Sequence, residues 1–292
     1  MVNKHESLCC FLGIDTQGVV SGSHLPILLQ KVKLAVFEQL LYQRYKIVLS
    51  EEEKVGFSGD GKELRASIES GNTRGESVGQ FVRHSDRAPL SQSYYNGKKE
   101  SEQPGMRQLL VESGAVSQKV SFEALHLSPQ TTQLIAQAGG TYLIGLKAHQ
   151  AELLQMMEKN SSYLTPVNQK VTLDKGHGRI EKRHYFQYAM GWECFDEPWQ
   201  GSDFQSLYKL AVVVEREMIE YRTGKQSQQI AYYLSNGKAE KNQHEFKAIR
   251  EHWTIEVNNH IPDVTLREDD FRTKKSPLQK LLLDLELWLS KL

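Results

Sequence analysis

The sequence predicts an α/β fold with a mixed sheet, in which three antiparallel strands are followed by parallel strands and helices. Short β-rich runs at 55–60, 78–83 and 90–95 are separated by turn residues, a pattern typical of an antiparallel meander. From residue 104 onward, helical segments alternate with apolar strand-like segments. This alternation indicates parallel strands joined by crossover helices.

Composition is that of an ordinary globular protein. The 292 residues are 39% hydrophobic and 25% charged, enough for one large domain or one domain with an appendage. The formal net charge of +0 gives no overall basic field, so nucleic acid would have to be held by local patches. Cys9, Cys10 and Cys194 have neither metal-ligand spacing nor a disulfide framework, and no apolar run has membrane-spanning length. We expect a cytoplasmic protein with no membrane partner.

The first strand ends in an acid between two glycines. The run at 55–60 leads into Gly59-Asp60-Gly61, which predicts a strand that presents the Asp60 carboxylate at its tip. The alternative is a hairpin turn, because Asp-Gly is a common turn signal, and residue types alone favour the turn.

The remaining elements follow from periodicity and from breaker residues. An amphipathic helix is expected within 23–50, where apolar residues recur at helical spacing after Pro26. Glu123 follows the fourth strand directly, and Gly139-Gly140 ends a helix. Further helices are expected at 104–113, 129–138, 148–158, 241–257 and 277–291, and further strands at 118–122, 142–146, 179–190, 207–219 and 228–235.

Three acidic residues would lie close together in this arrangement. Asp60 and Glu123 end the first and fourth strands, whose tips converge if these strands are neighbours in the sheet. A helix packed over the sheet would bring Glu256 to the same place. Carboxylate oxygens suit Mg²⁺ or Mn²⁺, and two such ions about 4 Å apart support phosphodiester chemistry.

Five ordered motifs carry a resemblance to a known family. The chain resembles the H-repeat-associated group of bacterial insertion-sequence DDE transposases from about residue 23 to about residue 272. The motifs are FSGDGKELRASI at 57–68, KVSFEALHLSPQT at 119–131, GGTYLIGLKAHQ at 139–150, DKGHGRIEKR at 174–183 and AIREHWTIEVNNHIPDVTLRED at 248–269.

This resemblance implies a ribonuclease-H-like DDE catalytic domain at 51–275, with a small β-rich insertion at about 175–237. Residues 1–50 would then be the remnant of an N-terminal helical region, and 276–292 a C-terminal helix packed on the core. It also implies that Asp60, Glu123 and Glu256 are the catalytic metal ligands, for two Mg²⁺ or Mn²⁺ ions. DNA, as transposon ends and target, is the implied partner, and a homodimer in a paired-end complex is the implied assembly.

The chain departs from the family pattern at three points. Glu123 stands where the family has Asp before Ala-Leu-His, the N-terminal helical region is short, and Ala66 replaces a Gly. The extra methylene of Glu123 shifts its carboxylate, and a displacement of about 1 Å can cost ~10²-fold in a positioned reaction. The alternative to an active transposase is therefore a degenerate, catalytically impaired remnant that keeps the fold and DNA binding.

Other polar residues are candidates for contact with DNA phosphates or for support of the carboxylates. In the basic motif at 174–183 the alternative is a solvated hairpin edge with charge pairs, and the lysine after the fifth strand could simply cap that strand. His252 shares a helix face with Glu256, the alternative being packing under the sheet. The candidates are Lys147, His177, Arg179, Arg183, Arg250, His252 and Asn259.

Overall fold

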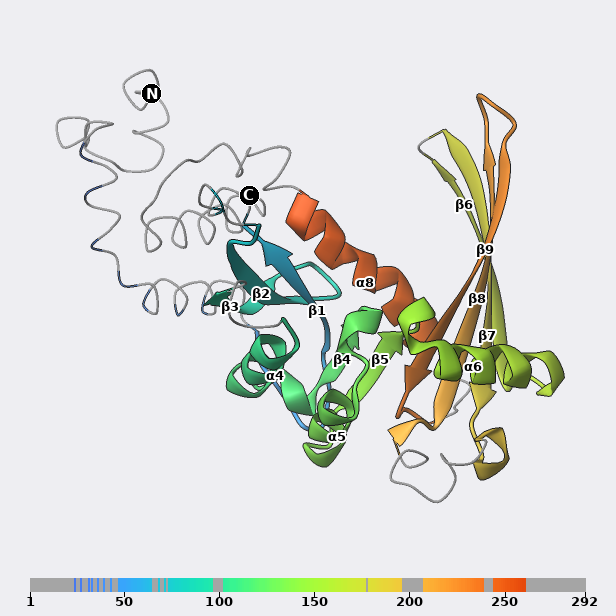
Figure 1. Cartoon of the computed structure of the whole chain (residues 1–292), viewed down its shortest axis with the longest axis horizontal. Helices are drawn as coiled ribbons and strands as arrows, with labels where there is room; N and C mark the ends of the chain where they lie inside the picture. Colours follow the sequence, from blue (N-terminus) through green and yellow to red (C-terminus); the bar gives the residue numbers. More distant parts are fainter. Residues whose placement is uncertain are drawn as a thin grey trace.

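A computed structural model describes residues 47–64, 73–96, 102–176, 178–195, 207–238 and 244–260, with a few isolated positions between 24 and 71. The helices expected within 23–50 and at 277–291 lie outside these described ranges. Within them, the chain forms one nine-stranded mixed sheet with the order β3-β2-β1-β4-β5-β9-β8-β7-β6 (Figure 1).

The first five strands have the predicted order and directions. β1 (Gly56–Glu63), β2 (Glu76–Arg83) and β3 (Pro89–Asn96) form the antiparallel meander. β4 (Lys119–Phe122) runs parallel to β1, and β5 (Thr141–Gly145) runs parallel to β4. This is the sheet of a ribonuclease-H-like fold, so the predicted fold class is confirmed.

The β-rich part extends the same sheet beyond β5. β9 (Gln226–Ser235) pairs antiparallel with β5, and β8 (Leu210–Glu220), β7 (Arg179–Ala189) and β6 (Asn168–Gly176) follow, all antiparallel. The strand at 168–176 was not predicted. It is mostly solvent-exposed along its length and lacks an apolar run, so its sequence NQKVTLDKG carries no strand signal.

Helices cover the sheet on both faces (Figure 1). One apolar cluster lies under α4 (Glu102–Glu112), α5 (Pro129–Gln137) and α6 (Ala151–Tyr163). A second, smaller cluster lies under α8 (His244–His260). Val213 belongs to the first cluster and its neighbours Val212 and Val214 to the second, as expected for alternating side chains of a strand covered on both faces. Single 3₁₀ turns are found at Ala115–Ser117, Ala124–His126, Ala148–Gln150 and Trp192–Cys194.

The described α-helices pack against the sheet through one apolar face. None of them is both long and apolar enough to cross a membrane. The largest, α8, places Phe246 and Ile249 against the sheet and leaves Trp253 exposed, which is the pattern of a helix with one buried face.

Asp60 lies inside its strand rather than at the tip. β1 continues to Glu63, and Asp60 pairs with Gln80 of β2, so neither the strand-tip prediction nor the hairpin turn is correct. The parallel pairing with β4 ends at Gly59, whereas β1 itself continues to Glu63. Asp60 and the three residues after it pair with β2 alone.

Gly59 allows two aromatic rings to close over β1 beside Asp60. A Cβ at this position would overlap the rings of Phe122 and Phe81, which meet edge to face with centroids 5.6 Å apart. Both rings are buried in the main core. The Phe122 ring can therefore approach β1 this closely only because residue 59 has no side chain.

Gly59→Ala is expected to lower the free energy of unfolding by about 1–3 kcal/mol, since the added methyl must displace two core rings. Urea denaturation followed by circular dichroism measures this. Gly176→Ala is the matched control, because nothing lies within 4 Å of a Cβ there. Equal denaturation midpoints for the two variants would contradict this packing.

Candidate metal-binding carboxylate site

The register of β1 and β4 places two of the predicted acids side by side. Their parallel pairing ends at Gly59 opposite Phe122, and the next residues are Asp60 and Glu123. Side chains alternate along a strand, so Asp60 and Glu123 share a face with Ser58 and Ser121. Ser121 contacts His252 of α8, which identifies this as the α8 face of the sheet.

Glu256 reaches the same place from α8. It lies four residues after His252, on the same side of the helix. Burial raises the pKa of Glu256, the nearby charge of Glu123 raises it further, and Lys147 opposes the shift. Asp60, Glu123 and Glu256 are far apart in the sequence, and in the fold they lie near enough for their charges to act on one another.

Asp60 carries the largest electrostatic perturbation of the group. Burial, then the charges of Glu102, Glu123 and Glu256, raise the pKa of its carboxyl from 3.8 to about 7, against a hydrogen bond from the Gly61 backbone. A shift of this size means that burial and the neighbouring like charges together disfavour the ionised form. Strongly shifted carboxyl groups of this kind are common at functional sites.

Glu102 is a fourth carboxylate that sequence reasoning missed. It opens α4, where an acid is ordinarily a favourable partner of the helix dipole. Here its side chain packs where Gly61 has none, and its Oε1 lies 2.9 Å from Nε2 of His126. The family motif contains this histidine three residues after Glu123, so a signal for His126 existed; none existed for Glu102.

Lys147 lies directly against Glu123. Its Nζ is 2.5 Å from Glu123 Oε2, and both side chains are substantially exposed, at 61% and 41%. Exposed pairs of this kind add little stability. Lys147 follows the end of β5 as Glu123 follows the end of β4, whereas Asp60 lies within β1.

The donor set fits a hard divalent cation in kind, since it offers carboxylate oxygens from three elements. Among the described residues, however, no group of three or more His, Cys, Asp or Glu side chains stands ready to hold an ion. Lys147 occupies one oxygen of Glu123.

A buried polar chain lies behind the carboxylates. Ser121 Oγ is 2.9 Å from His84 Nε2 and 2.9 Å from His252 Nδ1. Burial lowers the pKa of His84 to about 3 and that of His252 to about 4, so both rings are neutral near pH 7. His252 was predicted to support the site; His84 and Ser121 were not, because nothing in the sequence pairs them.

Comparison with known proteins agrees with the motifs. No protein-family model matches the chain. It is 24% identical over 239 residues to the "H repeat-associated putative transposase YhhI" of Escherichia coli (strain K12), covering 80% of this chain and 62% of that protein. The chain is thus similar to a protein of the H-repeat-associated group. It is also 25% identical over 229 residues to the "Putative protein YbfL" of the same strain, covering 76% of this chain and 59% of that protein. The chain thus spans about three fifths of these relatives.

In the basic segment 174–183, the described residues form ion pairs within their own part of the sheet. Arg183 is buried in ion pairs with Asp174 and Glu181, and Glu181 also pairs with Arg179 at 3.7 Å and with Arg216. These arginine charges lower the pKa of Glu181 against the effect of its burial. The arrangement matches the alternative of a hairpin edge with charge pairs.

Of the other predicted supporting residues, the structure describes the side chain of Arg250 but not those of His177 and Asn259. Arg250 projects from α8 to Asp174, with 3.3 Å between Nη2 and Oδ2. The backbone of Asn259 belongs to the last turn of α8, while its side chain and all of His177 lie outside the described part of the structure. Lys147 and His252 are therefore the candidates that the structure brings to the carboxylates.

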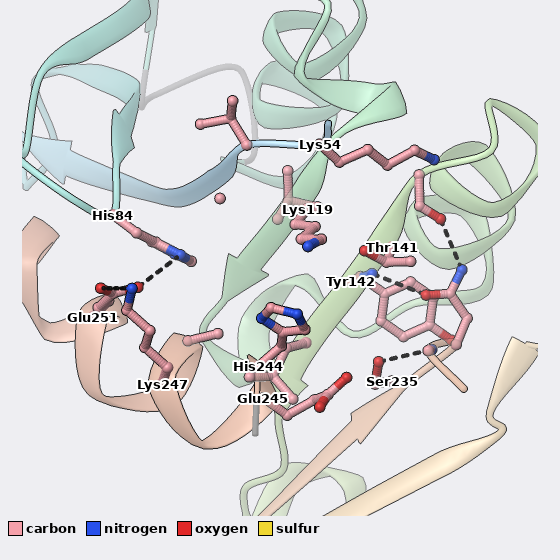
Figure 2. Close-up of a pocket in the computed structure, with 18 of the residues that line it drawn as sticks. Lys54, His84, Lys119, Thr141, Tyr142, Ser235, His244, Glu245, Lys247 and Glu251 are labelled. Carbon is pink, nitrogen blue, oxygen red and sulfur yellow. Dashed lines mark hydrogen bonds and ion pairs between the residues drawn. The ribbon is translucent and has the colours of Figure 1, made fainter. Parts of the chain in front are cut away.

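A cavity of about 880 Å³ lies at the opposite ends of β4 and β5 (Figure 2). Lys119 and Thr141, the first residues of these strands, line it, whereas Glu123 follows the last residue of β4. His84 and Glu251 form one wall of the cavity. The cavity and the carboxylate site are separate places, and the buried chain through Ser121 lies between them.

Asp60→Asn is expected to flatten the dependence of stability on pH. The folded-state pKa of Asp60 is raised, so its contribution to stability is complete below about pH 3.8 and is lost as the pH rises through about 7. Asparagine does not ionise and loses nothing over this range. Urea unfolding in chelator at a series of pH values measures the difference.

The control for this measurement is Glu152→Gln, which removes an exposed carboxylate of α6 outside the cluster. Its stability profile should run parallel to that of the unmodified chain. If Asp60→Asn also runs parallel, the carboxyl is not strained by its neighbours and the description of the site is wrong.

Proposed function

We propose that this chain is the catalytic part of a DDE transposase, which cleaves DNA strands at insertion-sequence ends and joins them to a target. The observation that carries the proposal is the convergence of Asp60, Glu123 and Glu256 on one face of a ribonuclease-H-like sheet. The same residues lie in the motifs that resemble the family. Likeness to a protein named as a putative transposase supports the proposal.

In this proposal the three carboxylates hold one or two Mg²⁺ or Mn²⁺ ions. When bound, these ions supply the activation of water and then of the freed 3′-hydroxyl for in-line attack on phosphodiesters. Asp60 is the residue whose charge depends most on such a cation, because burial, and then the charges of its neighbours, raise the pKa of its carboxyl to about 7. Lys147, exposed beside Glu123, is placed to contact a DNA phosphate.

Partners and location follow from the same proposal. DNA contributes both transposon ends and target, and two copies of the protein act together in a paired-end complex in the cytoplasm. A chain with a net charge of +0 must bind such DNA through local basic groups. Lys147 is the described basic residue in contact with a proposed catalytic residue.

The second candidate function is an impaired relative that keeps the fold and DNA binding. Glu123 favours this second candidate, because its side chain is one methylene longer than that of the family Asp. Its carboxylate is paired with Lys147, and among the described residues it is not part of a group of three or more side chains that could hold an ion. Such a displacement is large enough to slow a positioned reaction.

Nicking of a supercoiled plasmid that carries the inverted repeats flanking the gene tests the proposal. Mn²⁺-dependent nicking at the repeat ends is expected for the unmodified chain. Asp60→Asn and Glu256→Gln should each reduce it at least ~10²-fold, because each removes a metal-binding carboxylate. Glu152→Gln is the control and should nick at the unmodified rate.

Other outcomes separate the alternatives. Nicking by Glu123→Asp but not by the unmodified chain would show an impaired transposase. Cleavage of plasmids with and without the repeats alike would show a metal-dependent nuclease unrelated to transposition. Nicking that survives in both Asp60→Asn and Glu256→Gln would remove the carboxylate site from the account.

A further inference from the structure

Four side chains form a polar chain between α8 and the sheet, from the wall of the cavity to the carboxylate site. Glu251 Oε2 lies 3.8 Å from His84 Nδ1, and Figure 2 shows these two side chains facing each other. His84 Nε2 and His252 Nδ1 each lie 2.9 Å from Ser121 Oγ. Ser121 is 2% exposed and His84 8%, so water competes little with these contacts.

Counting protons gives this chain a direction. Each neutral imidazole carries one N–H, and the serine hydroxyl has one proton to donate. The Glu251 carboxylate can only accept, so it favours the proton of His84 on Nδ1 even at a distance too long for a direct hydrogen bond. His84 Nε2 is then an acceptor, and the Ser121 hydroxyl donates to it.

The direction continues to His252. With its own proton given to His84, Ser121 Oγ accepts from His252, whose proton therefore lies on Nδ1. The reverse direction would turn a lone pair of His84 toward the Glu251 carboxylate and bury an N–H of His252 without an acceptor. Both of these cost free energy. The longer contacts of Ser121, to Phe57 O and Ser58 Oγ at 3.4 Å, do not change the result, because a serine that donates there still accepts from His252.

The far end of the chain is the second nitrogen of His252. Nε2 is buried and has no hydrogen-bond partner among the described residues. The charged or titratable groups that act on this ring from the elements around it are Glu123, His126 and Lys147. Nε2 is thus an unprotonated lone pair on a ring that the charge of Glu123, a proposed catalytic residue, acts on.

We propose that His252 Nε2 is a nitrogen ligand for a divalent cation at this site, and that Glu251, His84 and Ser121 are positioning residues that keep its proton on Nδ1. Metal-binding histidines ordinarily donate their other N–H to a supporting group in this way. An imidazole ligand shifts the preference of a carboxylate site from Mg²⁺ toward Mn²⁺, Co²⁺ and Zn²⁺. The ligand role rests on the proposed function, whereas the proton position does not.

The first test needs no metal. ¹⁵N spectra of histidine-labelled protein in chelator should show His252 with a protonated Nδ1 and a bare Nε2. Ser121→Ala and Glu251→Gln should each move the ring toward a mixture of the two tautomers. Lys247→Met is the matched control, because it removes the ion pair of Lys247 with Glu251 Oε1 and leaves Oε2 facing His84. A proton on Nε2 in the unmodified chain would overturn the inference.

The second test uses Mn²⁺ alone, without DNA. Pulsed electron paramagnetic resonance of bound Mn²⁺ should show coupling to one nitrogen, which is lost in His252→Gln and kept in His126→Gln. Glu251→Gln should weaken Mn²⁺ binding about 10- to 100-fold, the usual effect of losing a supporting partner. Lys247→Met should bind Mn²⁺ as the unmodified chain does. Circular dichroism checks that each variant folds. If His252→Gln does not fold, the Mn²⁺ affinity of Glu251→Gln still tests the inference.

The outcomes separate this inference from the proposed function. Mn²⁺ bound without nitrogen coupling, in a protein that nicks DNA, overturns the His252 ligand and leaves the transposase proposal standing. Nitrogen coupling in a protein that never nicks DNA supports the ligand and contradicts the transposase proposal. A chain that binds no Mn²⁺ overturns the ligand role as well.

Discussion

The parallel register between β1 and β4 is the constraint on which the rest of the site depends. Because the two strands part after Gly59 and Phe122, Asp60 and Glu123 follow at neighbouring positions on one face. Gly59 lets the Phe122 ring lie against β1 on the other face, where the main core is. Hydrophobic packing on one side of the sheet thus holds together, on the other side, carboxylates that repel each other.

Charge crowding is the consequence of that packing. Asp60 is buried near Glu102, Glu123 and Glu256, and its pKa rises to about 7. Lys147 and His126 each pair with one of these carboxylates, at the ends of β5 and of the turn after β4. A carboxyl pKa raised in this way is a common feature of functional sites. The buried chain from Glu251 to His252 adds an oriented nitrogen to the same centre.

The sequence predicted those elements of the fold that leave a local pattern in it. The strands with apolar cores and the helices with breaker residues were found from spacing, and the roles of the three acids came from the family resemblance. β6 was missed because it is polar and largely exposed, and Asp60 was placed at a tip because the apolar run ends there. Glu102, His84 and Ser121 carry no signal of their own. Their roles arise from contacts between residues 24 to 131 positions apart, which only the folded chain displays.

Proton release on cation binding tests the central claim most directly. Isothermal titration with Mn²⁺ in buffers of different ionisation enthalpy counts the protons displaced per ion. If carboxylate crowding holds a proton on this cluster, about one proton should leave per ion near pH 6 and almost none near pH 8, since a ligand must be deprotonated to bind. Mn²⁺ binding with no proton release at the lower pH, or with equal release at both, would contradict the account.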